Sequence, residues 1–197
     1  MQDRCTFAME AQPVSTIARA LGASPECTPA MLIAHLRALR SLELRARCEA
    51  RIRTEHLFLS AARLEARTLA RLSYRALVDA APEDISAWID QQIEHAAVEL
   101  ITEDLLIPET AAQPEPALEW ARSLGIEPQH AHLACAQLNI LPLELRRACR
   151  RLFEGSDTLK NCAAEMGLSC KDLKEQIEQV LTHIHRMTAH DAGVESA

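Results

Sequence analysis

The sequence predicts an all-α protein made of two small helical domains. Aromatic residues make up only 3% of the 197 residues and the chain has just 5 glycines, so Leu, Ala and Ile must fill its core. That composition favours helix packing over β-sandwiches. Apolar residues also recur at helical spacing in several stretches, and no stretch has the pattern of a strand. The hydrophobic content of 48% and the charged content of 25% are those of an ordinary globular protein.

A proline-rich stretch predicts the domain boundary. Pro108, Pro114 and Pro116 lie too close together for the interior of a helix, and no apolar periodicity crosses them. We therefore expect a helical domain over residues 1–107, a linker over residues 108–117 and a second helical domain over residues 118–197.

Several helices are expected on each side of this linker. In the first domain, Thr28 and Pro29 predict a helix start, and apolar spacing predicts a long helix from about Thr54 to Leu77. Acidic residues near Asp84 are expected to begin a third helix, with Trp88 on its inner face. In the second domain, the spacing predicts shorter helices over residues 117–124, 129–139 and 142–153.

Charge is distributed unevenly along the chain, whose net charge is −7. Residues 1–75 contain 12 Lys or Arg and 7 Asp or Glu, whereas residues 76–121 contain 11 acidic residues and no Lys or Arg. An acidic block of this kind suits a basic protein surface or plain solvent. The basic and acidic segments could also bind each other in a closed form.

Cysteine and histidine usage predicts no cofactor and no metal site. The 7 cysteines form no C-x-x-C motif, and the start of the chain lacks the pattern of a signal peptide, so we expect reduced thiols in a cytoplasmic protein. No apolar run is long enough to cross a membrane. His130 and His132 are two residues apart and would point apart on a helix, so they are expected to be ordinary surface histidines near a buried Cys135. No catalytic motif is present, and we do not expect an enzyme.

The sharpest local pattern spans residues 157–173 and predicts a helix-turn-helix. Asp157 would cap the first helix, Ala163 would let the second helix approach, and Gly167 would supply the left-handed turn. Ser169 would cap the second helix, with Asp172 as its capping-box partner. The apolar face of the second helix would contain Leu173, Ile177, Val180 or Leu181, and Ile184.

A second helix of this kind would enter the major groove of double-stranded DNA. Its outward positions are expected to be Lys171, Lys174, Gln176 and Gln179, while Glu175 and Glu178 would weaken attraction to phosphates. The alternative for the same pattern is a helical hairpin that only packs within the protein.

The run LPLELRR over residues 141–147, a Gly-containing connection at Gly155 and the helix-turn-helix that follows resemble the C-terminal promoter-reading domain of bacterial sigma factors. The resemblance is to the small extracytoplasmic-function type and covers residues 141–187, about a quarter of the chain. It implies double-stranded DNA and the RNA polymerase core as partners, with an anti-sigma-like protein as a further partner. A basic protein partner is suggested instead by the acidic block over residues 76–121. It also implies DNA contacts for Lys171, Lys174, Gln176 and Gln179, and backbone or polymerase contacts for Arg146 and Arg147.

A weaker resemblance to the sigma N-terminal domain extends over residues 67–104. In that family the helix after the Trp carries basic and aromatic residues that hold melted promoter DNA. Here the helix after Trp88 carries acidic residues and no Lys or Arg, so promoter melting is not expected. The leading interpretation is a sigma-like transcription regulator. The alternative is a helical protein-interaction module that docks by its acidic segment without binding DNA.

Overall fold

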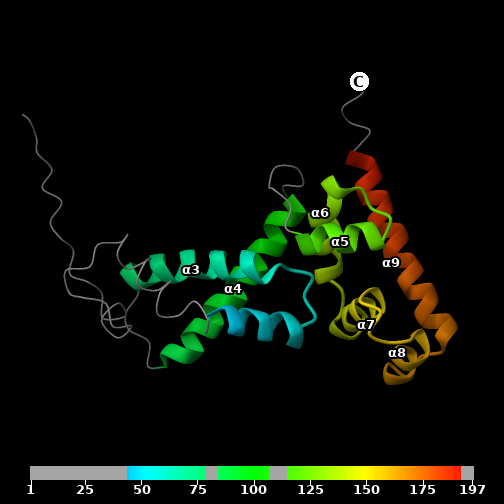
Figure 1. The fold of residues 1–197 in the computed structure, drawn as a ribbon, viewed down its shortest axis with the longest axis horizontal. Coiled ribbons are helices and arrows are strands. Elements are labelled where there is room, and N and C mark those ends of the chain that lie inside the picture. The colour runs from blue at the N-terminus through cyan, green and yellow to red at the C-terminus, as the bar shows by residue number, and fades with distance from the viewer. Residues whose placement is uncertain (1–43, 79–83, 107–114, 192–197) are drawn as a thin grey trace, which may run out of the picture.

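The computed structural model describes residues 44–78, 84–106 and 115–191, and these residues form helices joined by turns, with no strand among them (Figure 1). The expected all-α fold class is confirmed. A helix over residues 44–54 comes first. It is followed by α3 (Ala61–Val78), α4 (Ile85–Leu106), α5 (Glu115–Ser123), the 3-10 turn η1 (Pro128–His130), α6 (Ala131–Asn139), α7 (Leu143–Phe153), α8 (Leu159–Glu165) and α9 (Cys170–Asp191).

Most helix ends lie within two residues of their predicted positions, but the helix predicted over residues 54–77 is wrong at its start. The chain instead turns at His56, whose φ is 52°, and helix α3 begins only at Ala61. Residues 55–60, a turn followed by four irregular residues, form a link between the 44–54 helix and α3. The link gives Leu57 to one core and Phe58 to another, which one straight helix would not do. The predicted helix at Thr28 lies outside the described residues.

The first core lies between the 44–54 helix, α3 and α4. Asp84 begins α4 by accepting hydrogen bonds at Oδ1 from the backbone N–H groups of Ser86 (2.8 Å) and Ala87 (3.1 Å). Trp88 is buried there, as expected for a core anchor. The buried members of this core are Leu44, Cys48, Ile52, Leu57, Leu59, Leu64, Leu69, Leu72, Trp88, Ile89, Ile93, Ala96, Ala97 and Leu100.

The acidic residues of α4 form ion pairs with arginines of the preceding helices. These pairs are Arg47–Asp90, Arg51–Glu94, Arg71–Glu99, Arg67–Glu103 and Arg63–Asp104. They include all five carboxylates that α4 contains. The basic segment and the acidic block are therefore in direct contact within the described residues.

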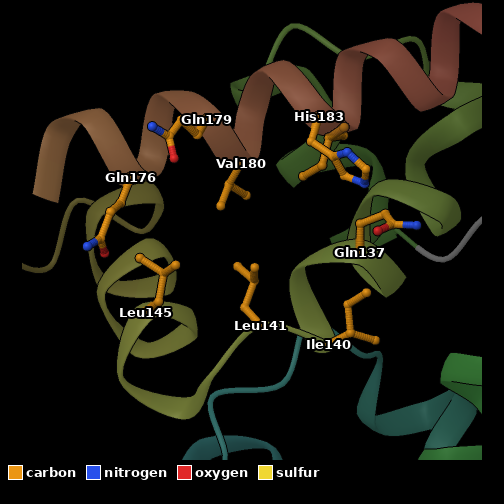
Figure 2. Close-up of a pocket in the computed structure, with 9 residues that line it drawn as sticks. Gln137, Ile140, Leu141, Leu145, Gln176, Gln179, Val180 and His183 are labelled. Carbon is orange, nitrogen blue, oxygen red and sulfur yellow. The ribbon is translucent and has the colours of Figure 1, made fainter.

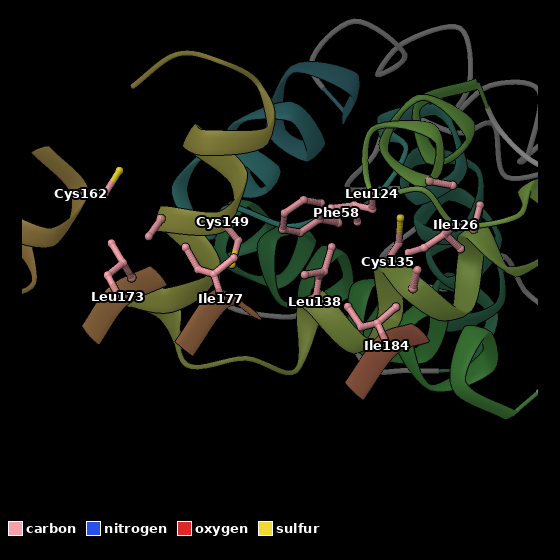
Figure 3. Packing of buried hydrophobic residues seen from close by; sticks show 14 of the residues in the cluster. Phe58, Leu124, Ile126, Cys135, Leu138, Cys149, Cys162, Leu173, Ile177 and Ile184 are labelled. Carbon is pink, nitrogen blue, oxygen red and sulfur yellow. The ribbon is translucent and has the colours of Figure 1, made fainter. Parts of the chain in front are cut away.

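The second core is formed by α5 to α9, with α9 running along one edge of the molecule beside α7 and α8 (Figure 1). Phe58 is the one described residue before the proline-rich stretch that belongs to it, and Figure 3 shows its side chain among buried side chains of the later helices, such as Leu124 and Leu138. The other buried members are Ala121, Leu124, Ile126, Ala131, Ala134, Cys135, Leu138, Ala148, Cys149, Cys162, Ala163, Leu173, Ile177 and Ile184.

Polar contacts around Phe58 join the two cores. Asn139 Oδ1 accepts a hydrogen bond from the backbone N–H of Phe58 (2.7 Å), and Asn139 Nδ2 donates to the Phe58 carbonyl (3.3 Å). Arg150 Nη1 donates to the carbonyls of Ile52 (3.1 Å) and Leu57 (2.7 Å). The ring of Phe58 meets that of Trp120 edge-on, with centroids 4.6 Å apart. The 55–60 link thus connects both cores.

Helix α5 begins at Glu115, so the last residues of the predicted 108–117 linker belong to a helix. Pro116 is tolerated there because the first turn of a helix does not need its backbone donor. In the part of the chain that the structure describes, no helix combines the length and the apolar character needed to cross a membrane.

Candidate nucleic-acid interface

Helix α8 begins at a cap one residue later than predicted. Thr158, not Asp157, is the N-cap, and its hydroxyl accepts a hydrogen bond from the backbone N–H of Asn161 (3.3 Å). Asp157 instead accepts at Oδ1 from the backbone N–H of Thr158 (2.7 Å) and from the side chain of Asn161 (2.9 Å). These bonds, with Arg151 beside the carboxyl, hold the pKa of Asp157 below its ordinary value.

The turn between α8 and α9 has the predicted chemistry. Gly167 has a φ of 67°, which is the left-handed region, and a Cβ placed on it would meet no atom within 4 Å. The requirement for glycine is therefore conformational rather than steric. The backbone N–H of Leu168 reaches back to the Ala163 carbonyl (2.9 Å), as in a helix that ends at a C-capping glycine.

Ser169 caps α9 as predicted, because its hydroxyl accepts a hydrogen bond from the backbone N–H of Asp172 (3.1 Å). The same hydroxyl donates to Asp172 Oδ2 (2.8 Å), so the two side chains are joined directly. Leu173, Ile177 and Ile184 then lie buried on the inner face of α9, with Val180 and Leu181 partly buried beside them. The inner face is fixed, and the opposite face is left for contacts outside the protein.

Lys171 and Lys174 lie on the exposed side of α9, with 83% and 65% of their side chains accessible. Each is near a carboxylate one turn further along the helix. Lys171 Nζ lies 3.7 Å from Glu175 Oε1, and Lys174 Nζ lies 3.5 Å from Glu178 Oε1. The two predicted lysines are thus accessible, and each is paired with a glutamate of its own helix.

Gln176 and Gln179 lie to one side of the lysines and line a shallow groove of about 350 Å³. Figure 2 shows Gln176 and Val180 projecting from α9 towards Leu145 and Leu141 across this groove. Ile140, which is exposed, lies at its edge. The four predicted positions on α9 therefore divide into a lysine side and a glutamine side.

Arg146 and Arg147, predicted as backbone or polymerase contacts, are engaged inside the protein. Arg146 is only 9% exposed, and its Nη1 donates to the Asn139 carbonyl (2.5 Å). Burial lowers its pKa. Arg147 is partly exposed and lies 2.9 Å from Glu165 of α8. Both side chains thus hold neighbouring segments in place.

Lys160 is a further exposed lysine that the helix-turn-helix pattern did not single out. It is exposed in the first turn of α8 and adds a third lysine to the α8–α9 unit. It lies two residues after the Thr158 cap, on the helix that precedes the expected recognition helix.

The two histidines expected at the surface are buried, at 6% exposure each, so that expectation is wrong. Every residue of α6 is buried, because this helix lies in contact with α4, α5 and α9. His132 Nδ1 lies 3.0 Å from Arg63 Nη1 and 3.6 Å from Asp104 Oδ1. Within the described residues, no three His, Cys, Asp or Glu side chains are grouped so that they could hold a metal ion.

Asp104 is the charged centre of this buried group. Burial alone would raise its pKa, but the adjacent His132 ring and the hydrogen bonds that Arg63 donates to both carboxylate oxygens outweigh that effect and keep the pKa below its ordinary value. The geometry is that of a structural ion pair between α3 and α4, extended to α6.

Comparisons of the whole chain with protein-family models, with curated proteins and with solved structures gave no match.

Proposed function

We propose that this protein is a sigma-like transcription regulator that binds double-stranded DNA through α9, in association with RNA polymerase, and does not melt promoters. The observation that carries the proposal is the α8–α9 unit. A left-handed glycine turn and a serine cap precede a helix whose first turns present Lys171 and Lys174 to solvent. The N-terminal residues of such a helix are those that contact base edges in helix-turn-helix proteins.

Helix α7 supports the proposal because it forms one unit with α8 and α9. Glu165 of α8 lies 2.9 Å from Arg147 Nη2 and 2.6 Å from Arg151 Nη1. These ion pairs orient α8 on α7, and α8 in turn packs against α9. The segment with the sigma-like residue pattern, 141–187, is therefore also a segment whose helices are bound to one another.

The charge of α4 supports the absence of promoter melting. Helix α4 contains no Lys or Arg, and the arginines opposite its five carboxylates are already held in ion pairs with them, which leaves little basic charge for a phosphate backbone. A single-stranded nucleic acid is held by basic grooves and aromatic stacking. Helix α4 offers neither on its exposed side.

The ion pairs between arginines of α3 and carboxylates of α4 weaken the alternative of an adaptor that docks by its acidic segment. Glu99 and Glu103 are already paired with arginines of α3, and Asp104 is buried against Arg63. A basic partner would have to displace these arginines before it gained the same contacts. DNA binding through α9 would displace only ion pairs between solvent-exposed side chains of α9, which contribute little to stability.

Fluorescence anisotropy with labelled duplex DNA at two salt concentrations tests the proposal, beside a pull-down with core RNA polymerase. We expect DNA affinity that falls steeply as salt rises, because phosphate contacts release bound counterions. Charge reversal in Lys171→Glu plus Lys174→Glu should weaken binding by at least about tenfold, since each phosphate contact contributes a few-fold in affinity.

The matched control is Arg53→Glu plus Arg122→Glu, which changes the net charge equally at exposed positions outside α9. If the control weakens binding as much as the lysine variant, α9 is not the DNA-binding surface. If neither the wild-type protein nor the control binds DNA or polymerase, the proposed function is wrong.

A further inference from the structure

The charged side of α9 has a feature that stability does not explain. Its two lysines precede their glutamates by one turn, in the pairs Lys171–Glu175 and Lys174–Glu178. In isolated helices the opposite order, with Glu before Lys, is the more stabilising one. Lysines near a helix N-terminus also oppose the helix dipole, whose positive end lies there.

The exposure of these ion pairs also argues that they do little to stabilise the fold. The side chains of Glu175 and Glu178 are 55% and 60% exposed, and those of the lysines are more so. Ion pairs in solvent contribute little to stability because water screens them and the long side chains lose freedom. The folded structure therefore gains little from placing four charges in this order.

The arrangement does have a clear effect on an approaching polyanion. Binding to DNA phosphates is driven by each cation that can release a counterion. Here each lysine has a carboxylate within 4 Å, and that carboxylate repels the phosphate that would replace it. DNA must break two ion pairs to use two lysines. A carboxylate in the major groove can still accept a hydrogen bond from a cytosine amino group, so it does not oppose base contacts equally.

We infer that Glu175 and Glu178 attenuate the DNA affinity of α9, holding Lys171 and Lys174 in ion pairs that suppress binding to DNA of arbitrary sequence. This inference rests on the proposed function. It assigns to the two glutamates a regulatory role at the same surface, in which phosphate attraction alone is too weak to retain the protein on DNA.

The test is an anisotropy titration of the full chain with a labelled duplex of random sequence. The variant is Glu175→Gln plus Glu178→Gln, and the control is Glu119→Gln plus Glu127→Gln, which changes the net charge equally at exposed residues outside α9. We expect the α9 variant to bind on the order of tenfold more tightly than the wild-type protein at low salt, and to show a steeper salt dependence. The control should gain much less.

Three outcomes are distinguishable. A tighter complex with the α9 variant alone supports the inference. Equal affinity of the α9 variant and the control overturns the inference while leaving DNA binding intact. No measurable binding by the wild-type protein or by the α9 variant at low salt overturns the proposed function, and the inference with it.

Discussion

Residues 44–106 and residues 115–191 both bury apolar helix faces, but the charges of α3 and α4 in the first region are used differently from those of α9 in the second. In the first region, arginines of α3 pair with carboxylates of α4, so the charges join separate helices. On α9 the charged residues pair along their own helix and stay in solvent. Charges of the first kind support the fold, whereas charges of the second kind are available for a partner. A charge count along the sequence does not distinguish the two.

The largest effect is expected at the contact between the regions. Phe58→Ala should lower the free energy of unfolding by about 4 kcal/mol, because it removes a fully buried ring and leaves a cavity that the rigid helices cannot fill. Urea denaturation followed by circular dichroism measures this. Tyr74→Ala, at an exposed aromatic residue, is the control and should change stability by less than about 0.5 kcal/mol. An equally small change for Phe58→Ala would show that the two cores are not joined through this side chain.

A smaller effect is expected from the buried ion pair of the first region. Asp104→Asn should cost about 3 kcal/mol, since it leaves the Arg63 guanidinium without its carboxylate in a poorly hydrated place. Glu94→Gln removes a solvent-exposed partner of Arg51 and should cost less than about 1 kcal/mol. If the two substitutions cost the same, burial does not distinguish these ion pairs.

The lowered pKa of Asp104 predicts that the stability of the wild-type protein depends on pH more strongly than that of Asp104→Asn. Because its folded-state pKa is lowered, the carboxylate contributes stability above its unfolded-state pKa, and this stability is lost as pH falls through the folded-state pKa. The wild-type protein should therefore lose more stability than Asp104→Asn between about pH 7 and about pH 3. Equal losses of stability in the two proteins would contradict a lowered pKa of Asp104 in the folded state.

The last prediction concerns thiol reactivity and no change in stability. Cysteines in the two cores should react more slowly than the exposed cysteine at the start of α9. Burial raises the pKa of Cys48 to about 11 and the pKa values of Cys135 and Cys149 to about 12. Cys170 is exposed at the start of α9. Iodoacetamide at about pH 8, followed by peptide mass spectrometry, should modify Cys170 before Cys48, Cys135 and Cys149, because only the thiolate reacts. Labelling in urea is the control, and rapid native labelling of Cys135 would mean that the second core opens.

Local patterns explain which parts of the candidate site could be predicted. Gly167, the Ser169–Asp172 cap and the buried face from Leu173 to Ile184 depend on residues within a few positions of one another, and the structure has each as expected. The exposure of Lys171 and Lys174 follows from the same helical period. The helix ends after Pro108 were likewise predicted to within two residues, because proline and glycine act locally.

Other features depend on distant contacts that no local pattern contains. Arg146 and Arg147 share one sequence pattern, yet Arg146 is buried because the Asn139 carbonyl and the 55–60 link lie beside it. The helix is interrupted at His56, and two residues later the backbone N–H of Phe58 donates a hydrogen bond to Asn139, which is 81 positions away in the sequence. Gln176 looked like a DNA-reading residue, and only the approach of α7 places it beside a groove.

By itself, the sequence determined the all-α class, the turn chemistry of the α8–α9 unit and the inner face of α9, because helical period and capping act over a few residues. The tertiary structure alone decided which charges join helices and which remain in solvent, since that depends on the helix that packs opposite. It also decided the burial of Arg146, His130 and His132. Their surroundings come from α4 to α6 and the 55–60 link, and helices far apart in sequence had to meet before those side chains were enclosed.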